Sequence, residues 1–309
     1  MVLFNYILMC LIFGTTFLSI KVGVDAGAPP FFSAGIRFLV AGIILFLWMV
    51  SRGKARFSLL LRKEMLLTGT GLTFATFAAL YWSEQYLSSG IAAVLSATGP
   101  LMVLLLQTAI NRQKLSISSL VGCLIGFAGV ILLLLPGIMG TSFSKLWIIG
   151  CLAILLSELF YSAGAVYSSR VIQRFQGTSP IALNAAQMMY GGGLLLVLSL
   201  FTENVHIEFM LSTNVILSLL YLIIAGSMVA HTIFYWLVAK TNPVFPATWL
   251  YISPLIALCL GGLLYHEHLT FLSVIGGIII IIGTIIVNIN NLKHLIRRRP
   301  SLVGKESNL

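Results

Sequence analysis

The sequence has few charged residues. Of its 309 residues, 8% are charged and 59% are hydrophobic, and the mean hydropathy is +1.05. A soluble domain carries about 25% charged residues, so this composition excludes an ordinary water-soluble fold. It also disfavours a transmembrane β-barrel, because barrel strands alternate apolar with polar residues and the segments here are apolar all round. We therefore predict an all-α polytopic membrane protein.

Several chemical motifs are missing as well. No Walker motif, nucleotide-binding segment or long soluble segment appears, which argues against direct coupling to ATP. The spans hold no His-Asp or His-Glu cluster at metal-ligand spacing, and the short loop His266-Glu267-His268 is a weak metal candidate. The four cysteines lie in apolar stretches without paired spacing, which is typical of small buried apolar residues. We expect no metal, no other cofactor and no enzymatic activity.

Ten apolar segments follow one another, separated by Pro, Gly and charged residues. The first segment lacks the basic n-region of a signal peptide, so we assign it as a membrane helix. Roughly 20 apolar residues cross a bilayer. The predicted spans are residues 3–23, 31–50, 64–85, 88–110, 116–135, 147–168, 181–202, 213–237, 243–264 and 269–291.

The basic residues predict the orientation in the membrane. The formal net charge is +10, but the basic residues fall between and after the apolar segments, which favours a topology signal over nucleic-acid binding. Ten spans put both termini on one side, and 15 of the 18 Lys and Arg residues fall on that side. The positive-inside rule makes it the cytoplasmic side. Lys21, Arg37 and Lys145 fall towards the other face.

The second half of the chain repeats the first. At an offset of 154 residues, Tyr81-Trp82 aligns with Tyr235-Trp236 and Pro100 aligns with Pro254, without a gap from residue 81 to residue 133. The fourth and ninth spans are therefore counterparts, and so are the fifth and tenth. The first halves agree more loosely.

Two five-helix repeats follow from this alignment. At an offset of 149, increased by one inserted residue, Gly42 aligns with Gly192. We assign residues 1–136 and 147–291 as the repeats and residues 292–309 as a basic cytoplasmic tail. Because five is odd, the second repeat enters the membrane from the opposite face. Inverted repeats are an architecture of secondary transporters, with a site near the midplane between the halves.

Four stretches carry a family resemblance. FGTTFLSIKVG (Phe13–Gly23), Pro29–Gly42, SSGIAAVLSATGPL (Ser88–Leu101) and Ser119–Leu135 resemble the drug/metabolite transporter superfamily in its EamA-type branch. The resemblance extends from about residue 4 to residue 290 and includes both repeats. It implies a ten-helix carrier of the cell membrane with both termini cytoplasmic. In that family the first, third, fourth, sixth, eighth and ninth helices surround a central cavity, and the substrates include amino acids, nucleosides and other small metabolites.

Glu158 is the most informative polar residue. It lies eleven residues past Trp147, roughly 16 Å along a helix, and hence near the midplane of the sixth span. An ionised carboxylate there costs about 3 kcal/mol on insertion scales, so such residues usually face a cavity and act in transport. Three roles stay open: a site that loads and releases protons, a partner for a substrate's ammonium group, and a protonated group that holds two helices together.

Aromatic and polar residues extend the candidate substrate site. The repeated pairs Tyr81-Trp82 and Tyr235-Trp236 are candidates for lining a cavity, with cation–π capacity towards an ammonium group. The alternative is an aromatic belt at the membrane interface. His231 lies one turn before Tyr235 on the same face. His231, Gln187 and Tyr161 have either a transport role or a helix–helix hydrogen bond.

Two prolines and three charges complete the candidates. Pro100 and Pro254 are counterparts, and proline kinks a helix by removing a backbone hydrogen bond. We expect Lys21 and Arg37 to lie towards the outer face, where long basic side chains snorkel to the interface. Glu84, at a depth similar to that of Arg37, has either an ion pair or a role in an outer vestibule.

These features predict a secondary transporter that exports amino acids or related small metabolites by alternating access. The expected partners are the substrate, the lipid bilayer and protons as coupling ion, and the sequence gives no oligomeric state. An importer or exchanger of nucleoside- or cofactor-like metabolites is the alternative. An intramembrane enzyme and a structural membrane protein are less favoured.

The charge distribution gives a first testable prediction. Cysteines introduced at Lys54 and near Arg298 are expected to resist an impermeant thiol reagent in intact cells, because both lie on the basic side of the chain. A cysteine near Ser142 is expected to react. Labelling at both Lys54 and Arg298 would overturn the orientation.

Overall fold

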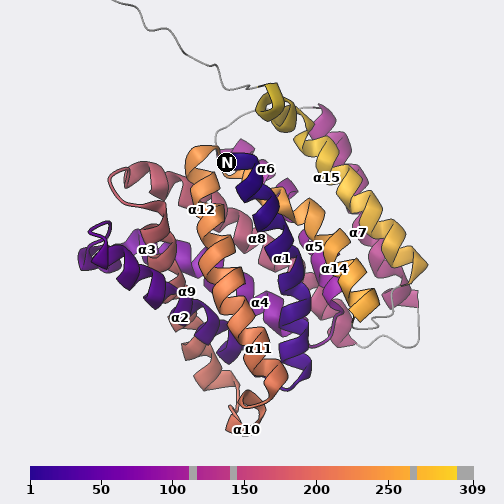
Figure 1. Ribbon diagram of the computed structural model, residues 1–309. Coiled ribbons are helices and arrows are strands. Elements are labelled where there is room, and N and C mark those ends of the chain that lie inside the picture. Colours follow the sequence, from indigo (N-terminus) through magenta and orange to yellow (C-terminus); the bar gives the residue numbers. More distant parts are fainter. Residues whose placement is uncertain (111–116, 140–144, 265–269, 298–309) are drawn as a thin grey trace, which may run out of the picture.

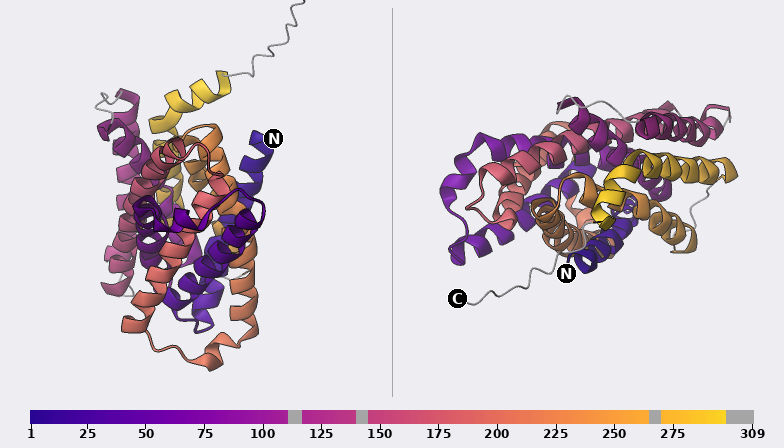
Figure 2. Two further views of the ribbon diagram at one scale, coloured as in Figure 1. Left: turned by 90° about the vertical axis from the view of Figure 1, so that its left-hand side faces the viewer. Right: turned by 90° about the horizontal axis from the view of Figure 1, so that it is seen from above.

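The computed structural model describes residues 1–110, 117–139, 145–264 and 270–297, and every element in these ranges is helical (Figures 1 and 2). The first half contains α1 (Val2–Asp25), α2 (Pro30–Ser51), η1 (Phe57–Leu61), α3 (Lys63–Thr68), η2 (Gly69–Ala75), α4 (Thr76–Ser83), α5 (Ser89–Ser96), α6 (Gly99–Ile110) and α7 (Ile117–Met139). The second half contains α8 (Lys145–Arg174), α9 (Pro180–Thr202), α10 (Ile207–Met210), α11 (Thr213–Tyr221), η3 (Leu222–Ala230), α12 (His231–Lys240), α13 (Val244–Ala247), α14 (Trp249–Leu264) and α15 (Phe271–Arg297). The first residue and the end of α15 lie at the same end of the bundle (Figure 1).

The protein is an all-helical polytopic membrane protein. Within the described ranges, eight helical stretches are long and apolar enough to cross a membrane: Val2–Asp25, Pro30–Ser51, Lys63–Ser83, Ser89–Ile110, Lys145–Arg174, Pro180–Thr202, Thr213–Lys240 and Val244–Leu264. The helices α7 and α15, of 23 and 27 residues, are compatible with the other two predicted spans. The count of ten spans is thus compatible with the structure and stays a prediction.

Several predicted ends move. Helix α7 reaches Met139 rather than residue 135, and α15 reaches Arg297 rather than residue 291. Helix α8 has 30 residues and continues to Arg174, beyond the predicted end at residue 168. The apolar run ends earlier, but Val171 is buried against the bundle, so the added turns are held by packing. The cysteines only partly fit the expectation, because Cys10 and Cys151 are buried and free whereas Cys259 is exposed.

Helices α7 and α15 pack closely along their length (Figure 1). A Cβ atom on Gly129 of α7 would lie 2.7 Å from the backbone nitrogen of Ile280 and 2.8 Å from the carbonyl oxygen of Gly276. A Cβ atom on Gly283 of α15 would collide with the backbone of Gly126. Small residues let membrane helices approach in this way. The repeat alignment relates Gly129 to Gly283, so the contact is reciprocal.

Helices α2 and α9 form a second reciprocal pair. A Cβ atom on Gly42 of α2 would lie 2.9 Å from the carbonyl oxygen of Ala185, and one on Gly192 of α9 would lie 2.9 Å from that of Gly35. At the offset of 150, Gly42 corresponds to Gly192 and Gly35 to Ala185. The same contact is therefore made from both sides, which is compatible with two repeats related by a pseudo-two-fold axis.

The two π-helical segments occupy matching places. Residues 69–75 shift to 223–229 at the offset of 154, and the second segment, η3, spans Leu222–Ala230. The π-helix is rare and is frequent at functional sites. Each π-helical segment packs against the second helix of the other half: η2 packs against α9, and η3 packs against α2.

Neighbouring glycines on α9 give a test of this packing. Gly192→Ala is expected to lower the stability of the purified protein by about 1–3 kcal/mol, the usual cost of overpacking, because its Cβ would lie 2.5 Å from the backbone nitrogen of Leu39. Gly193→Ala is the matched control, since nothing lies within 4 Å of the added atom. Thermal unfolding in detergent measures both. Equal midpoints for the two variants would contradict the close contact.

Candidate functional site

A cavity lies at the centre of the helix bundle. About 550 Å³ of space in it and at its opening is not filled by protein atoms. Its walls come from α1, α2, η2, α4, α5, α8, α12 and α14, which include all six spans that the family resemblance assigns to a cavity. The residues that line it are Phe13, Thr16, Phe17, Arg37, Leu72, Thr76, Phe77, Leu80, Ser96, Glu158, Tyr161, His231, Phe234, Trp249 and Leu250.

Glu158 lies on the cavity wall formed by α8. Its side chain is buried, and its Oε2 atom has no hydrogen-bond partner among the described residues. The carboxyl group lies directly against Gly99 of α6, where a Cβ atom would collide with it. Two serines fix α8 at this point: Ser157 donates to the carbonyl oxygen of Thr76 (2.9 Å) and Ser162 to that of Gly99 (3.2 Å). The carboxyl group is held in place by its helix and retains a free acceptor.

Arg37, on α2 of the first half, lines the same cavity, and only 1% of its surface is exposed. Its Nε atom donates to Ser227 Oγ (2.9 Å) and its Nη1 atom to the Tyr81 hydroxyl (3.1 Å). Its Cζ atom lies 4.6 Å from the ring centroid of Phe38 and 5.2 Å from that of Phe77. Neither ion pair found in the described ranges includes Arg37.

Arg37 does not snorkel to the interface as expected, because its side chain is buried inside the bundle, while its position towards the outer face stays a prediction. Snorkelling is unnecessary because hydroxyl groups and aromatic faces surround the guanidinium group inside the bundle. Gly226 makes the room, since a Cβ atom there would lie 2.8 Å from Arg37 Nη2. The cavity thus contains one cationic side chain whose hydrogen-bond partners are uncharged.

His231 lies on α12 between aromatic rings. Its ring centroid is 5.0 Å from that of Phe13, 5.5 Å from that of Phe38 and 5.8 Å from that of Phe77. Neither ring nitrogen has a hydrogen-bond partner in the part of the chain that the structure describes. Tyr161, also on the cavity wall, accepts a hydrogen bond from Trp249 Nε1 (3.3 Å).

The repeated aromatic pairs do not line the central cavity. Tyr81 is buried and supports Arg37 through its hydroxyl group. Tyr235 is buried and contacts Phe234 edge-on, at 6.3 Å between ring centroids. Trp82 lines a separate recess of about 1050 Å³ at the end of the bundle away from the termini, and Trp236 is partly buried against the core.

Gln187 is the counterpart of Arg37 in the second half, at the offset of 150 residues. It accepts a hydrogen bond from Thr73 Oγ1 (2.7 Å) and donates to Asn184 Oδ1 (3.1 Å). Thr73 and Ser227 are counterparts as well, so each half bonds its second helix to the π-helical segment of the other half. Gln187 itself does not line the central cavity.

The two prolines differ in their surroundings. Pro100 is the second residue of α6, just after the Ala97-Thr98 break that separates α5 from α6. Pro254 lies inside α14, which continues through it. A break near the proline is thus present in one half only.

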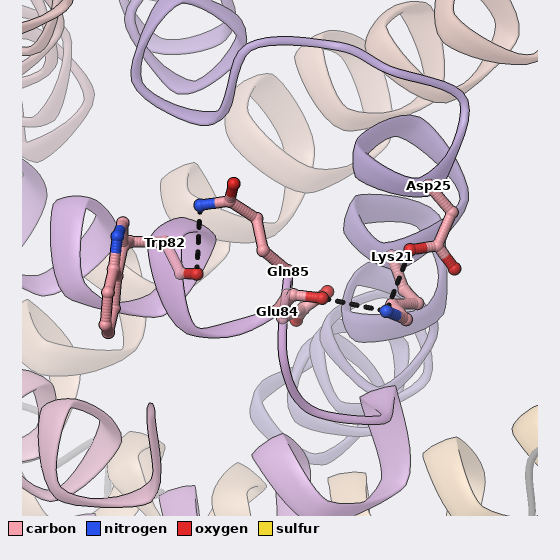
Figure 3. Close-up of polar contacts among 5 residues, drawn as sticks. All are labelled: Lys21, Asp25, Trp82, Glu84 and Gln85. Carbon is pink, nitrogen blue, oxygen red and sulfur yellow. Dashed lines mark hydrogen bonds and ion pairs between the residues drawn. The ribbon is translucent and has the colours of Figure 1, made fainter. Parts of the chain in front are cut away.

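Lys21 and Glu84 meet at the end of the bundle away from the termini. Figure 3 shows the Lys21 ammonium group between the Asp25 carboxylate (2.8 Å) and the backbone carbonyl oxygen of Glu84 (2.9 Å). Glu84 follows the last residue of α4, and a cation stabilises a helix at that end. Gln85 donates to the Trp82 carbonyl oxygen (3.2 Å), and Trp82 points away from Lys21.

Sequence reasoning missed the apolar lining. Phe13, Phe77 and Trp249 form much of the wall, yet aromatic residues in apolar spans are common and carry no signal alone. The repeat alignment could have identified one of these residues. At the offset of 154, Phe77 aligns with His231, which was already a candidate for the site. The loop at His266 lies outside the described residues.

Comparisons with known proteins agree with this architecture. The chain matches the model of the EamA-like transporter family over residues 1–135 and 148–289. It is 30% identical over 298 residues to the "Uncharacterized inner membrane transporter YedA" of Escherichia coli (strain K12), which covers 94% of this chain and 90% of that protein. It is 24% identical to the "Uncharacterized transporter YoaV" of Bacillus subtilis (strain 168), covering 91% and 94%.

A plant relative and a solved structure extend the comparison. The chain is 27% identical to a chloroplastic WAT1-related protein of Arabidopsis thaliana, over 84% of this chain and 63% of that protein. A solved crystal structure with 17% sequence identity has a TM-score of 0.68 and covers 94% of this chain and 97% of its own. At that identity the likeness shows a common fold.

Proposed function

The chain belongs to the EamA-like transporter family, and we propose that it is a secondary transporter that exports small metabolites of the amino-acid class. The substrate carries both a carboxylate and an ammonium group and crosses the cell membrane by alternating access. Residues 1–136 and 147–291 act as the two inverted repeats, and both termini and the tail 292–309 are cytoplasmic. The two stretches matched by the family model support this division.

The observation that carries the proposal is that Arg37 of α2 and Glu158 of α8 line the same cavity. Taking a charge out of water costs several kcal/mol unless a partner compensates it. Arg37 has uncharged hydrogen-bond partners, and Glu158 retains an acceptor without a partner among the described residues. A substrate carboxylate beside Arg37 and an ammonium group beside Glu158 supply the missing charges.

The remaining walls suit the apolar part of such a substrate. Phe13, Phe17, Phe77 and Trp249 present aromatic faces to the cavity. They bury an apolar side chain and attract an ammonium group through cation–π interactions. A sugar or a polyphosphate would leave many hydrogen-bonding groups without partners against these walls.

The reciprocal contacts support alternating access. The α2–α9 and α7–α15 contacts are each repeated with the halves exchanged, so two conformations of similar packing can open the cavity to one side and then to the other. In this scheme Glu158 is exposed to each side in turn. The carboxyl group then exchanges a proton for the substrate's ammonium group, which couples the two movements in opposite directions.

Proton coupling is tested in reconstituted vesicles. Glu158→Gln is expected to abolish the response of transport to a pH gradient, since an amide carries no exchangeable proton, while the level of folded protein is unchanged. Glu208→Gln is the matched control, because Glu208 is exposed and far from the cavity walls. Unchanged gradient-driven transport in Glu158→Gln would exclude the coupling role. If substrate binding by this variant is also unchanged, Glu158 is only a helix-packing residue.

The substrate class is tested by ligand-induced thermal stabilisation of the purified protein. Free amino acids are expected to stabilise the wild type, whereas their methyl esters and N-acetyl derivatives, which each lack one charge, are not. Arg37→Gln is expected to weaken binding by about 2 kcal/mol or more, roughly 30-fold. The variant should fold, because Gln187 makes the equivalent hydrogen bond in the other half. Equal stabilisation by the esters would contradict the role of Arg37.

A further inference from the structure

A groove at the basic end of the bundle is separate from the central cavity. It contains about 870 Å³ of space between the segment 53–62, which connects α2 to α3, and the segment 175–178, which follows α8. Three cationic residues line it: Lys54, Arg56 and Arg62. All three are exposed, and both ion pairs within the described ranges leave them out.

The groove has a fixed shape. Gly53 has a φ of 67°, and the backbone nitrogen of Lys54 donates to the Met49 carbonyl oxygen (2.9 Å), so α2 ends in a defined turn. Leu59 of η1 is buried, and the Tyr190 hydroxyl of α9 donates to the Leu60 carbonyl oxygen. The cations therefore project from a backbone that packing and hydrogen bonds hold in place.

Apolar side chains stand beside these cations. Phe57 is 60% exposed and Leu61 is 87% exposed, both on η1. Trp48, 46% exposed, lies near the end of α2, and the Cζ atom of Arg52 is 5.9 Å from its ring. Exposed aromatic and aliphatic residues next to cations are typical of a segment at the membrane interface.

The other half of the molecule supplies a comparison. At the offset of 150, residues 53–56 correspond to residues 203–206, which line the recess at the opposite end. In that recess Asn204 stands at the place of Lys54 and His206 at the place of Arg56, and Glu203 stands at the place of Gly53. The Glu203 carboxylate accepts hydrogen bonds from the backbone nitrogens of Phe31 (2.7 Å) and Phe32 (2.9 Å). The repeat explains why a hollow exists at both ends, but it does not explain three unpaired cations at one end.

We propose that this groove binds the phosphate headgroup of an anionic phospholipid through Lys54, Arg56 and Arg62. The acyl chains lie along Phe57 and Leu61, which favours a lipid over a free phosphate, since a free phosphate has no use for exposed apolar side chains. Basic groups near a membrane attract anionic lipids by about 1 kcal/mol each. Three of them correspond to a preference of roughly 100-fold over a zwitterionic lipid. The proposal is independent of the transported substrate.

The experiment compares two triple variants of the full-length protein. Lys54→Gln, Arg56→Gln and Arg62→Gln together remove the groove cations. Arg52→Gln, Arg170→Gln and Lys240→Gln remove the same charge from exposed residues of the same end that do not line the groove. Each delipidated protein is titrated with phosphatidylglycerol and with phosphatidylcholine in detergent, and bound lipid is counted by native mass spectrometry.

The wild type and the second triple variant are expected to bind phosphatidylglycerol at least tenfold more tightly than phosphatidylcholine, and the groove variant to lose this preference. Inorganic phosphate and glycerol phosphate at millimolar concentration are expected not to compete. A preference that survives in the groove variant, or that falls equally in both triple variants, would overturn the site. Competition by the soluble phosphates would overturn the assignment to a lipid. Unchanged thermal midpoints without lipid verify that both variants fold.

Discussion

The guanidinium group of Arg37, held inside a helical bundle that faces hydrocarbon, is the constraint on which the centre of the structure depends. Such a group is stable there only if hydrogen bonds and polarisable neighbours replace water. Ser227 and Tyr81 provide the hydrogen bonds, and Phe38 and Phe77 provide the aromatic faces. These partners fix the distance of α2 from η3 and α4. They also leave the guanidinium group on the cavity wall, outside both ion pairs of the described ranges.

The close helix pairs make that arrangement possible. Lipid supplies no hydrophobic drive for helices to associate, so packing has to hold the bundle together. The contacts of Gly42 and Gly192 between α2 and α9, and of Gly129 and Gly283 between α7 and α15, bring backbones together without side chains between them. Helices α1, α8, α12 and α14 are then free to face the cavity with their larger side chains.

Much of the helical plan is readable from the sequence, because a span needs only an apolar run of sufficient length and α1, α2 and α9 end where that run ends. Glu158, Tyr161 and His231 were identified as polar or aromatic groups in apolar spans, and they line the cavity. The burial of Arg37 inside the bundle was not predicted, because its partner Ser227 is 190 residues away and no local pattern encodes that contact. The repeat identified Tyr81 and Trp82 as equivalent to Tyr235 and Trp236. It did not give the rotation of each helix about its own axis, which decides which side chains face the cavity.

The missing side chain at Gly226 limits where a buried cation can stand. The counterpart of Gly226 at the offset of 154 is Leu72, whose side chain lines the cavity. A side chain at position 226 would displace the guanidinium group, whereas Gln187, the counterpart of Arg37, bonds through Thr73 to the π-helical segment that contains Leu72. An arginine on the second helix of one half therefore depends on a residue without a side chain on the π-helical segment of the other half. Adding a side chain at position 226 alone produces a collision with Arg37, and replacing Arg37 alone leaves the room at Gly226 without the guanidinium group.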